Sequence, residues 1–270
     1  MNRRLFVALL LVWSLSPLLW QVYTSFSSNQ ALVQPFAVVD SRWTLEHYRN
    51  VLTANPPFWR YLVNSLIVGV FSTVLCLLLA LPAAYALNRI PRRLSLLSRF
   101  SLVGAALFPY VLLFLALLET ARQFNLGNHL LALCFPYAAL TQPLAILLLS
   151  SAFSDLPPEL EDAAVLEGLN LFQRLRWVLI PLIAPATAST AILVFLFSWN
   201  EYPIALTWIS ESSKLTLPVA MARIAGSSVF SVPYGAYAAA TVLGSIPLVL
   251  IVLIFQKPIV SGLTSGAVKG

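Results

Sequence analysis

Long apolar runs alternate with short polar stretches along this chain. Each run holds about twenty residues, the length that an α-helix needs to cross a hydrocarbon layer of ~30 Å. Backbone polar groups inside a bilayer must find partners within the chain, so runs of this length predict helices. The predicted spans are residues 5–26, 61–87, 100–118, 130–152, 184–205 and 236–255. The pattern therefore predicts an all-α integral membrane protein with six transmembrane helices.

A charged stretch, residues 155–181, separates the fourth predicted span from the fifth. Pro157 and Pro158 suit the first turn of a helix, and the acidic residues that follow suit its positive end. Because Gly168 has no Cβ atom, it allows either the end of this helix or the close approach of another backbone. Leu171–Trp177 then forms a further turn or two. The stretch predicts a rigid, partly apolar knob of the kind that docks into a groove on a partner protein.

The composition leaves no room for a large soluble domain. Hydrophobic residues make up 59% of the chain and charged residues only 10%, against about 25% charged in an ordinary soluble domain. Cys76 and Cys134 fall inside predicted spans without CxxC spacing, so they indicate packing residues and not a metal or disulfide site. The first apolar run is longer than a signal-peptide core of ~7–15 residues and lacks a clear cleavage site, which favours a retained span.

The basic residues predict the orientation of the spans. With six spans both termini lie on one side, which collects ten Lys and Arg residues, whereas the other side has six. The ten are Arg3, Arg4, Arg89, Arg92, Arg93, Arg99, Arg174, Arg176, Lys257 and Lys269. By the positive-inside rule this side is cytoplasmic, together with both termini and residues 155–181. The net charge of +6 is thereby explained without nucleic acid as a partner.

A search for catalytic or energy-coupling residues finds little. No lysine follows a glycine, so the GxxxxGK[ST] phosphate-binding loop is absent. His47 and His129 lie in loops on opposite sides, and neither HExxH nor GxSxG occurs. Glu119 and Glu201 fall near the outer ends of spans, and no inverted repeat is visible. An intramembrane enzyme and a self-sufficient secondary carrier remain the alternatives, both disfavoured, and no metal or cofactor is expected in this chain.

One motif within the charged stretch is specific. Asp162-Ala163-Ala164, three residues, Gly168, nine residues and Val178-Leu179-Ile180-Pro181 resemble the EAA loop of binding-protein-dependent ABC importer permeases. The family pattern is EAA, three residues, G, nine residues and IxLP. Asp162 replaces the usual Glu, and Val178 and Ile180 replace Ile and Leu. These replacements keep charge and shape.

The resemblance extends over essentially the whole chain and points to the carbohydrate branch, the smaller permease similar to the maltose system's G subunit. The segments that carry it are residues 44–48 (TLEHY), 64–67 (NSLI), 83–87 (AAYAL), 199–202 (WNEY) and 262–270 (GLTSGAVKG). Residues 225–228 and the C-terminal ending are similar to permeases for trehalose, maltose and related α-glucosides, including glucosylglycerol. The resemblance thus implies a permease subunit that forms half of the translocation pathway for an oligosaccharide or glycoside.

In this family the EAA segment is the coupling helix, seated in a cleft of a cytoplasmic ATPase subunit. The residues implied here are Glu161, Asp162, Ala163, Ala164, Glu167, Gly168 and Pro181. Acidic side chains would pair with basic groups of the ATPase, and the alanines would allow close approach. Within the tail, residues 256–270, a second contact is implied at Ser265, Gly266 and Lys269.

The implied partners are a homologous second permease, two ATPase subunits that hold ATP and Mg²⁺, membrane lipid and an extracytoplasmic sugar-binding protein. The implied location is the bacterial inner membrane. Sugar recognition needs hydrogen-bonding side chains and aromatic faces. Residues of these kinds inside spans are Asn64, Ser65, Tyr110, Tyr137, Gln142, Trp199 and Asn200. Each is equally well explained by an interhelical hydrogen bond or an interface aromatic. The outer loop Glu201–Tyr234 is expected to touch the binding protein.

Overall fold

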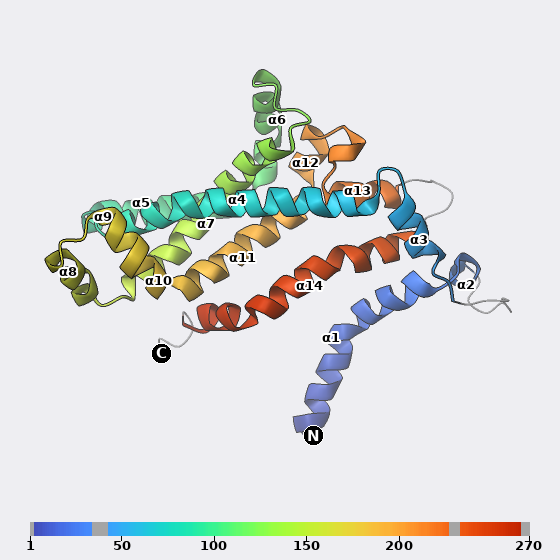
Figure 1. The fold of residues 1–270 in the computed structure, drawn as a ribbon, viewed down its shortest axis with the longest axis horizontal. Helices are drawn as coiled ribbons and strands as arrows, with labels where there is room; N and C mark the ends of the chain where they lie inside the picture. Colours follow the sequence, from blue (N-terminus) through green and yellow to red (C-terminus); the bar gives the residue numbers. More distant parts are fainter. Residues whose placement is uncertain (1–2, 34–42, 227–232, 266–270) are drawn as a thin grey trace. The chain divides into compact units, whose positions relative to one another are not determined.

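The computed structural model describes residues 3–33, 43–226 and 233–265, and these residues are overwhelmingly helical (Figure 1). Within these ranges the β-sheet hydrogen bonding consists of one isolated antiparallel bridge, between Ser27 and Trp43. Four helical segments are long and apolar enough to span a membrane, namely Leu5–Phe26, Phe58–Leu87, Leu130–Ser154 and Tyr234–Phe255. The helical, multi-pass character predicted from the hydropathy pattern is confirmed.

Two further apolar segments are sharply bent. Arg92–Leu107 and Tyr110–Gln123 meet at 82°, and Leu171–Leu182 and Ala184–Asn200 meet at 84°. If each bent pair counts as one span, the described part of the chain has six. The span predicted over residues 100–118 is interrupted, because its first helix ends at Leu107 and helical structure resumes at Tyr110. Pro109 has no N–H to continue a helix and pushes the preceding residue out of the helical region, so the helix stops before it.

Two other predicted boundaries are also corrected. The span expected over residues 184–205 ends as a helix at Asn200, and a separate short helix starts at Pro203. At the C-terminal end, the helix expected to stop near residue 255 continues to Ser265, so part of the expected tail is helical. Gly266 and Lys269 lie outside the described residues.

The chain divides into two compact units, and the first comprises Met1–Asn64 and Ser212–Val249. Its elements, in chain order, are α1 (Arg3–Phe26), α2 (Asn29–Val33), α3 (Glu46–Thr53), the start of α4 (Phe58–Leu87), η4 (Ser212–Lys214), α13 (Leu217–Ala225) and the first part of α14 (Tyr234–Ser265). The imidazole of His47 is buried, and its Nε2 lies 2.9 Å from the carbonyl oxygen of Ser27. A Cβ on Gly235 would lie 2.1 Å from that Nε2. The close packing of α3 against α14 therefore requires glycine.

The second unit comprises Ser65–Glu211 and Leu250–Gly270. After the remainder of α4 its elements are α5 (Arg92–Leu107), η1 (Tyr110–Leu113), α6 (Phe114–Gln123), η2 (Leu130–Leu133), α7 (Cys134–Ser154), α8 (Pro158–Leu166), α9 (Leu171–Gln173), η3 (Arg174–Leu179), α10 (Ile180–Leu182), α11 (Ala184–Asn200) and α12 (Pro203–Trp208), followed by the last part of α14. Because α7 has 21 residues, its two ends are separated by about 30 Å.

The core of the second unit, where α4 meets α7 and α11, combines small side chains with larger apolar ones. The core residues are Cys76, Ala80, Ala84, Ala138, Ala145, Leu149, Phe153, Leu179, Ile183 and Val194. Small side chains let helix backbones approach closely, which is how helices associate in a membrane where the hydrophobic effect between them is weak. Cys76 and Cys134 are buried and free, as expected of packing residues.

Candidate functional site

The charged stretch folds as a helical hairpin, residues Pro158–Leu182, that begins with α8 and ends with α10. Pro158 occupies the first turn of α8, where its missing N–H costs nothing. The helix ends at Gly168, whose φ is +79°. The N–H of Gly168 donates to the carbonyl of Val165 at 2.9 Å, and the N–H of Leu169 donates to that of Ala164 at 3.1 Å. This is a Schellman motif, and its left-handed residue explains why glycine stands here.

A second cap starts the return arm of the hairpin. The Asn170 side-chain oxygen accepts from the Gln173 N–H at 3.0 Å, and the Gln173 side-chain oxygen accepts from the Asn170 N–H at 2.9 Å. This capping box satisfies two helix-end donors and fixes the direction of the arm. The next six residues, Arg174–Leu179, form a π-helix. Pro181 lacks an N–H and crowds the turn before it, which agrees with a widened turn at this place.

The hairpin presents two different faces. Glu161 and Ala164, three residues apart, are buried against the chain, whereas Asp162, Ala163, Glu167 and Gly168 are exposed. Large apolar side chains are also exposed, at 89% for Leu166, 70% for Phe172 and 66% for Trp177. Figure 1 shows the hairpin projecting beyond the end of α7. An exposed face of apolar and acidic groups on rigid helices is typical of a docking surface.

The carboxylate of Glu161 points into the chain, where it joins three elements. It accepts hydrogen bonds from the Tyr85 hydroxyl near the C-terminal end of α4, from the Arg89 guanidinium in the turn that follows α4, and from Arg174 Nη1 of η3 at 3.1 Å. The exposed fraction of the Glu161 side chain is 11%. Arg89 also stacks over the Tyr85 ring, 5.2 Å from its centroid. Glu161 therefore faces away from the surface on which the acidic partner contacts were expected.

Next to this cluster, Asn88 ties the end of α4 to two more helices. Its side-chain nitrogen donates to the backbone oxygen of Ser150 on α7 at 2.8 Å, and its oxygen accepts from the Ser150 hydroxyl at 3.1 Å and from Arg99 on α5. In the sequence, Arg89 and Arg99 stand out only as charges that set the topology, and Asn88 does not stand out. The available signal was a polar run, residues 88–93, directly after an apolar span.

At the other end of α7 lies a second buried carboxylate, Glu201. Its oxygens accept from the Tyr137 hydroxyl at 2.6 Å, from the Ile204 N–H at 2.9 Å and from the Ala205 N–H at 3.1 Å. The residue is 3% exposed. Glu201 thus satisfies backbone donors at the start of α12 and fastens that helix to α7. Sequence reasoning noted this residue only as lying near the end of a span.

The seven substrate-path candidates are not one cluster. Tyr110 and Tyr137 come together around Phe197, with ring centroids 5.7 and 6.4 Å from its ring. Both tyrosines belong to the second unit, where Tyr110, Phe197 and Thr141 line an apolar cavity of about 310 Å³ between α5, η1, α7 and α11. This cavity has the size of a small ligand site but few polar groups.

The other candidates have structural contacts. Asn64, in the first unit, donates through its amide to the backbone oxygens of Ser213 and Leu215 at 3.1 and 2.9 Å. The Gln142 amide lies 3.3 Å from the Cys76 oxygen and 2.9 Å from the Ala80 nitrogen on α4. The remaining three are Ser65, which is buried, Trp199, which is buried and stacked on Phe195, and Asn200, which is exposed and bonded to its own helix.

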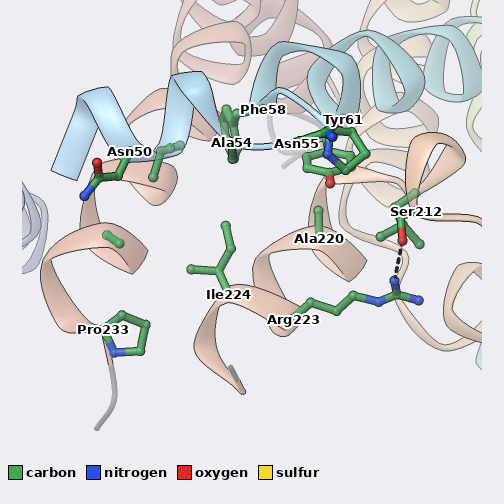
Figure 2. A pocket seen from close by; sticks show the side chains of 14 residues that line it. Asn50, Ala54, Asn55, Phe58, Tyr61, Ser212, Ala220, Arg223, Ile224 and Pro233 are labelled. Atoms are coloured by element: carbon green, nitrogen blue, oxygen red, sulfur yellow. Dashed lines mark hydrogen bonds between the residues drawn. The ribbon is translucent and has the colours of Figure 1, made fainter. Parts of the chain in front are cut away.

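A further cavity, of about 410 Å³, lies within the first unit (Figure 2). It is lined by α3, the start of α4, α13 and the start of α14. Figure 2 shows Arg223 extending toward Ser212, and its Nη1 donates to the Ser212 hydroxyl at 3.3 Å. Ser212, Arg223 and Pro233 belong to the outer loop expected to meet a binding protein, so the described part of that loop builds one wall of this cavity.

Comparison with known proteins decides the family. Residues 76–264, more than half of the chain, match the family described as "Binding-protein-dependent transport system inner membrane component". The chain belongs to this family of transport permeases. The permease is therefore a membrane transport subunit and not an enzyme, and the family implies an ATPase and a binding protein as partners. The resemblance read from the EAA-like motif is confirmed.

Several curated relatives cover nearly the whole permease. The trehalose transport system permease protein SugB of Mycobacterium tuberculosis is 37% identical, covering 96% of this chain and 93% of its own. The trehalose/maltose transport system permease protein MalG of Thermococcus litoralis is 37% identical, covering 97% and 94%. The sulfoquinovosyl glycerol transport system permease protein SmoH of Agrobacterium fabrum is 35% identical, covering 97% and 92%.

A solved structure supports the fold of the permease. A chain of a bacterial ABC transporter that imports the acidic polysaccharide alginate superposes with a TM-score of 0.78. The match covers 94% of both chains at 24% sequence identity. At this identity the likeness concerns the fold alone.

Proposed function

We propose that the permease forms half of the translocation pathway of an ATP-driven importer for an oligosaccharide or glycoside of the trehalose, maltose or glucosylglycerol type. A homologous second permease would supply the other half, and two ATPase subunits would hold ATP and Mg²⁺. An extracytoplasmic binding protein would deliver the sugar. Relatives named for trehalose, trehalose/maltose and sulfoquinovosyl glycerol, each matched over more than nine-tenths of its length, support a glycoside.

The proposed topology has six spans, with each bent helix pair counted as one, and both termini in the cytoplasm. The excess of arginine and lysine on one side supports this orientation. Arg89, Arg99 and Arg174, all assigned to the cytoplasmic side from sequence, lie in the polar contacts at one end of α7. The hairpin shares that end, which agrees with a cytoplasmic coupling helix.

The observation that carries the proposal is the exposed, doubly capped hairpin with a left-handed glycine at its turn. The ATPase would contact Asp162, Ala163, Glu167 and Gly168, because these residues occupy the exposed face of the hairpin. Glu161 and Ala164, which are buried, would support the hairpin from within, and Pro181, which is exposed, would shape its return arm. Closure of the ATPase pair would then move the hairpin as a rigid lever and reorient the pathway. Ser265, Gly266 and Lys269 are proposed as a secondary contact with the ATPase.

Along the proposed pathway the candidates divide by their contacts. Tyr110 lines the apolar cavity and Asn200 is exposed, so these two would offer an aromatic face and an amide to a sugar. Within the second unit, Ser65, Tyr137, Gln142 and Trp199 would form the supporting wall, and Asn64 would support the first unit. The cavity of Figure 2 lies beside the outer loop and is the proposed region of contact with the binding protein.

Gly168 provides the decisive test. A Cβ on Gly168 would meet no atom of this chain within 4 Å, so bulk there would meet a docked partner, but any L side chain at φ +79° also strains the turn. We expect Gly168→Trp to lower sugar uptake at least about tenfold while the protein is still made and inserted. Gly168→Asn is the matched control, because asparagine tolerates the left-handed conformation without the same bulk. Uptake at the wild-type level in the tryptophan variant would contradict the assignment.

Two measurements test the assembly and the substrate. Extraction in mild detergent should bring the ATPase and a second permease with this chain, and purification of the chain alone would contradict the importer. A thermal-shift screen of the cognate binding protein with trehalose, maltose, sucrose and glucosylglycerol should show stabilisation by at least one of them. No shift with any of the four would contradict the proposed glycoside class.

A further inference from the structure

We infer that Glu161 is a positioning residue that fastens the coupling hairpin to the end of α4, so that movement of the hairpin is carried directly to that span. The inference rests on the proposed function of the hairpin. To that function it adds the residue that attaches the hairpin to α4. This residue lies outside the Asp162-Ala163-Ala164 motif.

The attachment is concentrated at a single side chain. Among the described residues, Glu161 is the α8 residue whose side chain hydrogen bonds to another element. Ala164, one turn further along the same face, is 4% exposed and offers only apolar packing. The rest of α8 faces outward. The hairpin therefore has its own caps and packing, but its polar connection to α4 depends on the Glu161 carboxylate.

The charges explain why this connection holds. One carboxylate lies between two guanidinium groups, those of Arg89 and Arg174, with the Tyr85 hydroxyl as a further donor. Without the carboxylate, two like charges would remain close together, and Arg174 is only 21% exposed. A carboxylate shared between cations from two elements holds those elements together, because each charge-assisted hydrogen bond is stronger than a neutral one.

The end of α4 that contacts the hairpin is also hydrogen bonded to α5 and α7. Asn88 is the neighbour of Arg89 in sequence, and its amide binds Ser150 on α7 and Arg99 on α5. The Ser95 hydroxyl of α5 donates to the backbone oxygen of Leu87 at 2.9 Å. A displacement of α8 that reaches Tyr85 and Arg89 is therefore passed to α5 and α7 as well as to α4. Residues 85–89 form a joint between the hairpin and three membrane helices.

The experiment uses the whole complex, with ATPase, second permease and binding protein, reconstituted in proteoliposomes. The variants are Glu161→Gln, Glu161→Arg alone, and Glu161→Arg combined with Arg89→Glu. Glu159→Gln is the matched control, since it removes an exposed acid from the same helix. Three quantities are measured: the ratio of ATPase to permease after purification, ATP hydrolysis, and uptake of radiolabelled trehalose, or of whichever screened sugar stabilises the binding protein.

We expect Glu161→Gln to keep the ATPase bound within about twofold of wild type, because the docking face is unchanged, while sugar imported per ATP falls at least about tenfold. Glu159→Gln should match wild type in both. Glu161→Arg should be worse than Glu161→Gln, and the added Arg89→Glu should recover at least about threefold of the lost uptake per ATP, because a pair of opposite charges is restored.

Two outcomes would overturn the inference. One is equal uptake per ATP in Glu161→Gln and Glu159→Gln. The other is a loss of bound ATPase in proportion to uptake, without recovery in the charge-swapped variant, which would make Glu161 an ordinary folding contact. Failure of the proposed function is distinguishable from both, because wild-type permease would then retain no ATPase before any variant is compared.

Discussion

The two ends of α7 each hold a buried carboxylate, but they satisfy it in different ways. Glu161 takes its hydrogen bonds from side chains of α4, of the turn after α4 and of η3, two of them cationic. Glu201 has no cationic partner among the described residues and accepts from Tyr137 and from two backbone N–H groups of α12. The hydrogen bonds of Glu161 join side chains on separate elements, so they can break and form again. The N–H groups that Glu201 accepts from belong to the turn that Glu201 itself starts.

This difference indicates different duties. In the proposed mechanism the Glu161 end joins elements that move together, and its partners can be exchanged by charge. The Glu201 end holds a fixed corner, because removing its carboxylate leaves backbone donors that no side-chain rearrangement replaces. The hairpin end is accordingly suited to transmission, and the Glu201 end to keeping the opposite end of the unit rigid. The following predictions test this contrast.

The largest effect is expected for Glu201→Leu. The substitution leaves the Tyr137 hydroxyl and the N–H groups of Ile204 and Ala205 buried without an acceptor, at about 1–3 kcal/mol for each unsatisfied group. We expect the free energy of unfolding to fall by about 3–5 kcal/mol, measured by SDS titration in mixed micelles. Glu201→Gln retains one acceptor oxygen and should lose less than half as much. Equal losses in the two variants would show that hydrogen bonding is not what fixes this corner.

A smaller effect is expected for Gly69→Ala, which probes the packing beneath that corner. A Cβ at Gly69 would lie 2.7 Å from the Phe195 ring, which stacks on Trp199 with centroids 5.5 Å apart. Moving this aromatic pair should destabilise the permease by about 1–3 kcal/mol in the same titration.

Gly104→Ala is the control for this overpacking. A Cβ at Gly104 meets nothing within 4 Å, so helix propensity alone should make that change neutral or stabilising by up to about 1 kcal/mol. A neutral Gly69→Ala would mean that the Glu201 end is as adaptable as the hairpin end.

The smallest effect is expected for Tyr85→Phe at the hairpin end. It removes one of three donors to Glu161 and leaves both arginines in place. We expect a loss of about 1 kcal/mol in the free energy of unfolding. Tyr202→Phe, on an exposed ring of the same unit, should change it by less than about 0.5 kcal/mol. A loss of 3 kcal/mol or more would show that the hydroxyl, and not the pair of arginines, dominates the joint.

Local features were predictable because they depend on neighbours in sequence. The left-handed end at Gly168 and the start of α8 at the prolines follow from backbone geometry, and the helical spans follow from run length. The break at Pro109 is equally local, since proline interrupts a helix, but its size was not predictable, because hydropathy does not distinguish a slight kink from a bend of 82°.

The partners of polar side chains were not predictable in this way. Tyr137 and Glu201 are 64 residues apart, and Tyr85 and Glu161 are 76 apart. The sequence spacing of neither pair predicts a contact. Asn64 and Trp199 have the chemistry of sugar ligands. The Asn64 amide instead donates to two backbone oxygens, and the Trp199 ring stacks on another aromatic ring. Sequence identified residues that are costly to bury in a membrane, but not which other residue satisfies each.

By itself, the sequence determined the membrane class, the helical spans, the family and the place of the hairpin, since run length, charge and motif spacing are properties of the chain. Only the tertiary structure decided that Glu161 faces inward while Asp162 beside it faces outward. Adjacent residues on a helix point about 100° apart, and which direction is inside depends on where α4 and η3 lie. The motif thus defined the hairpin, and the packing of distant segments defined its attachment.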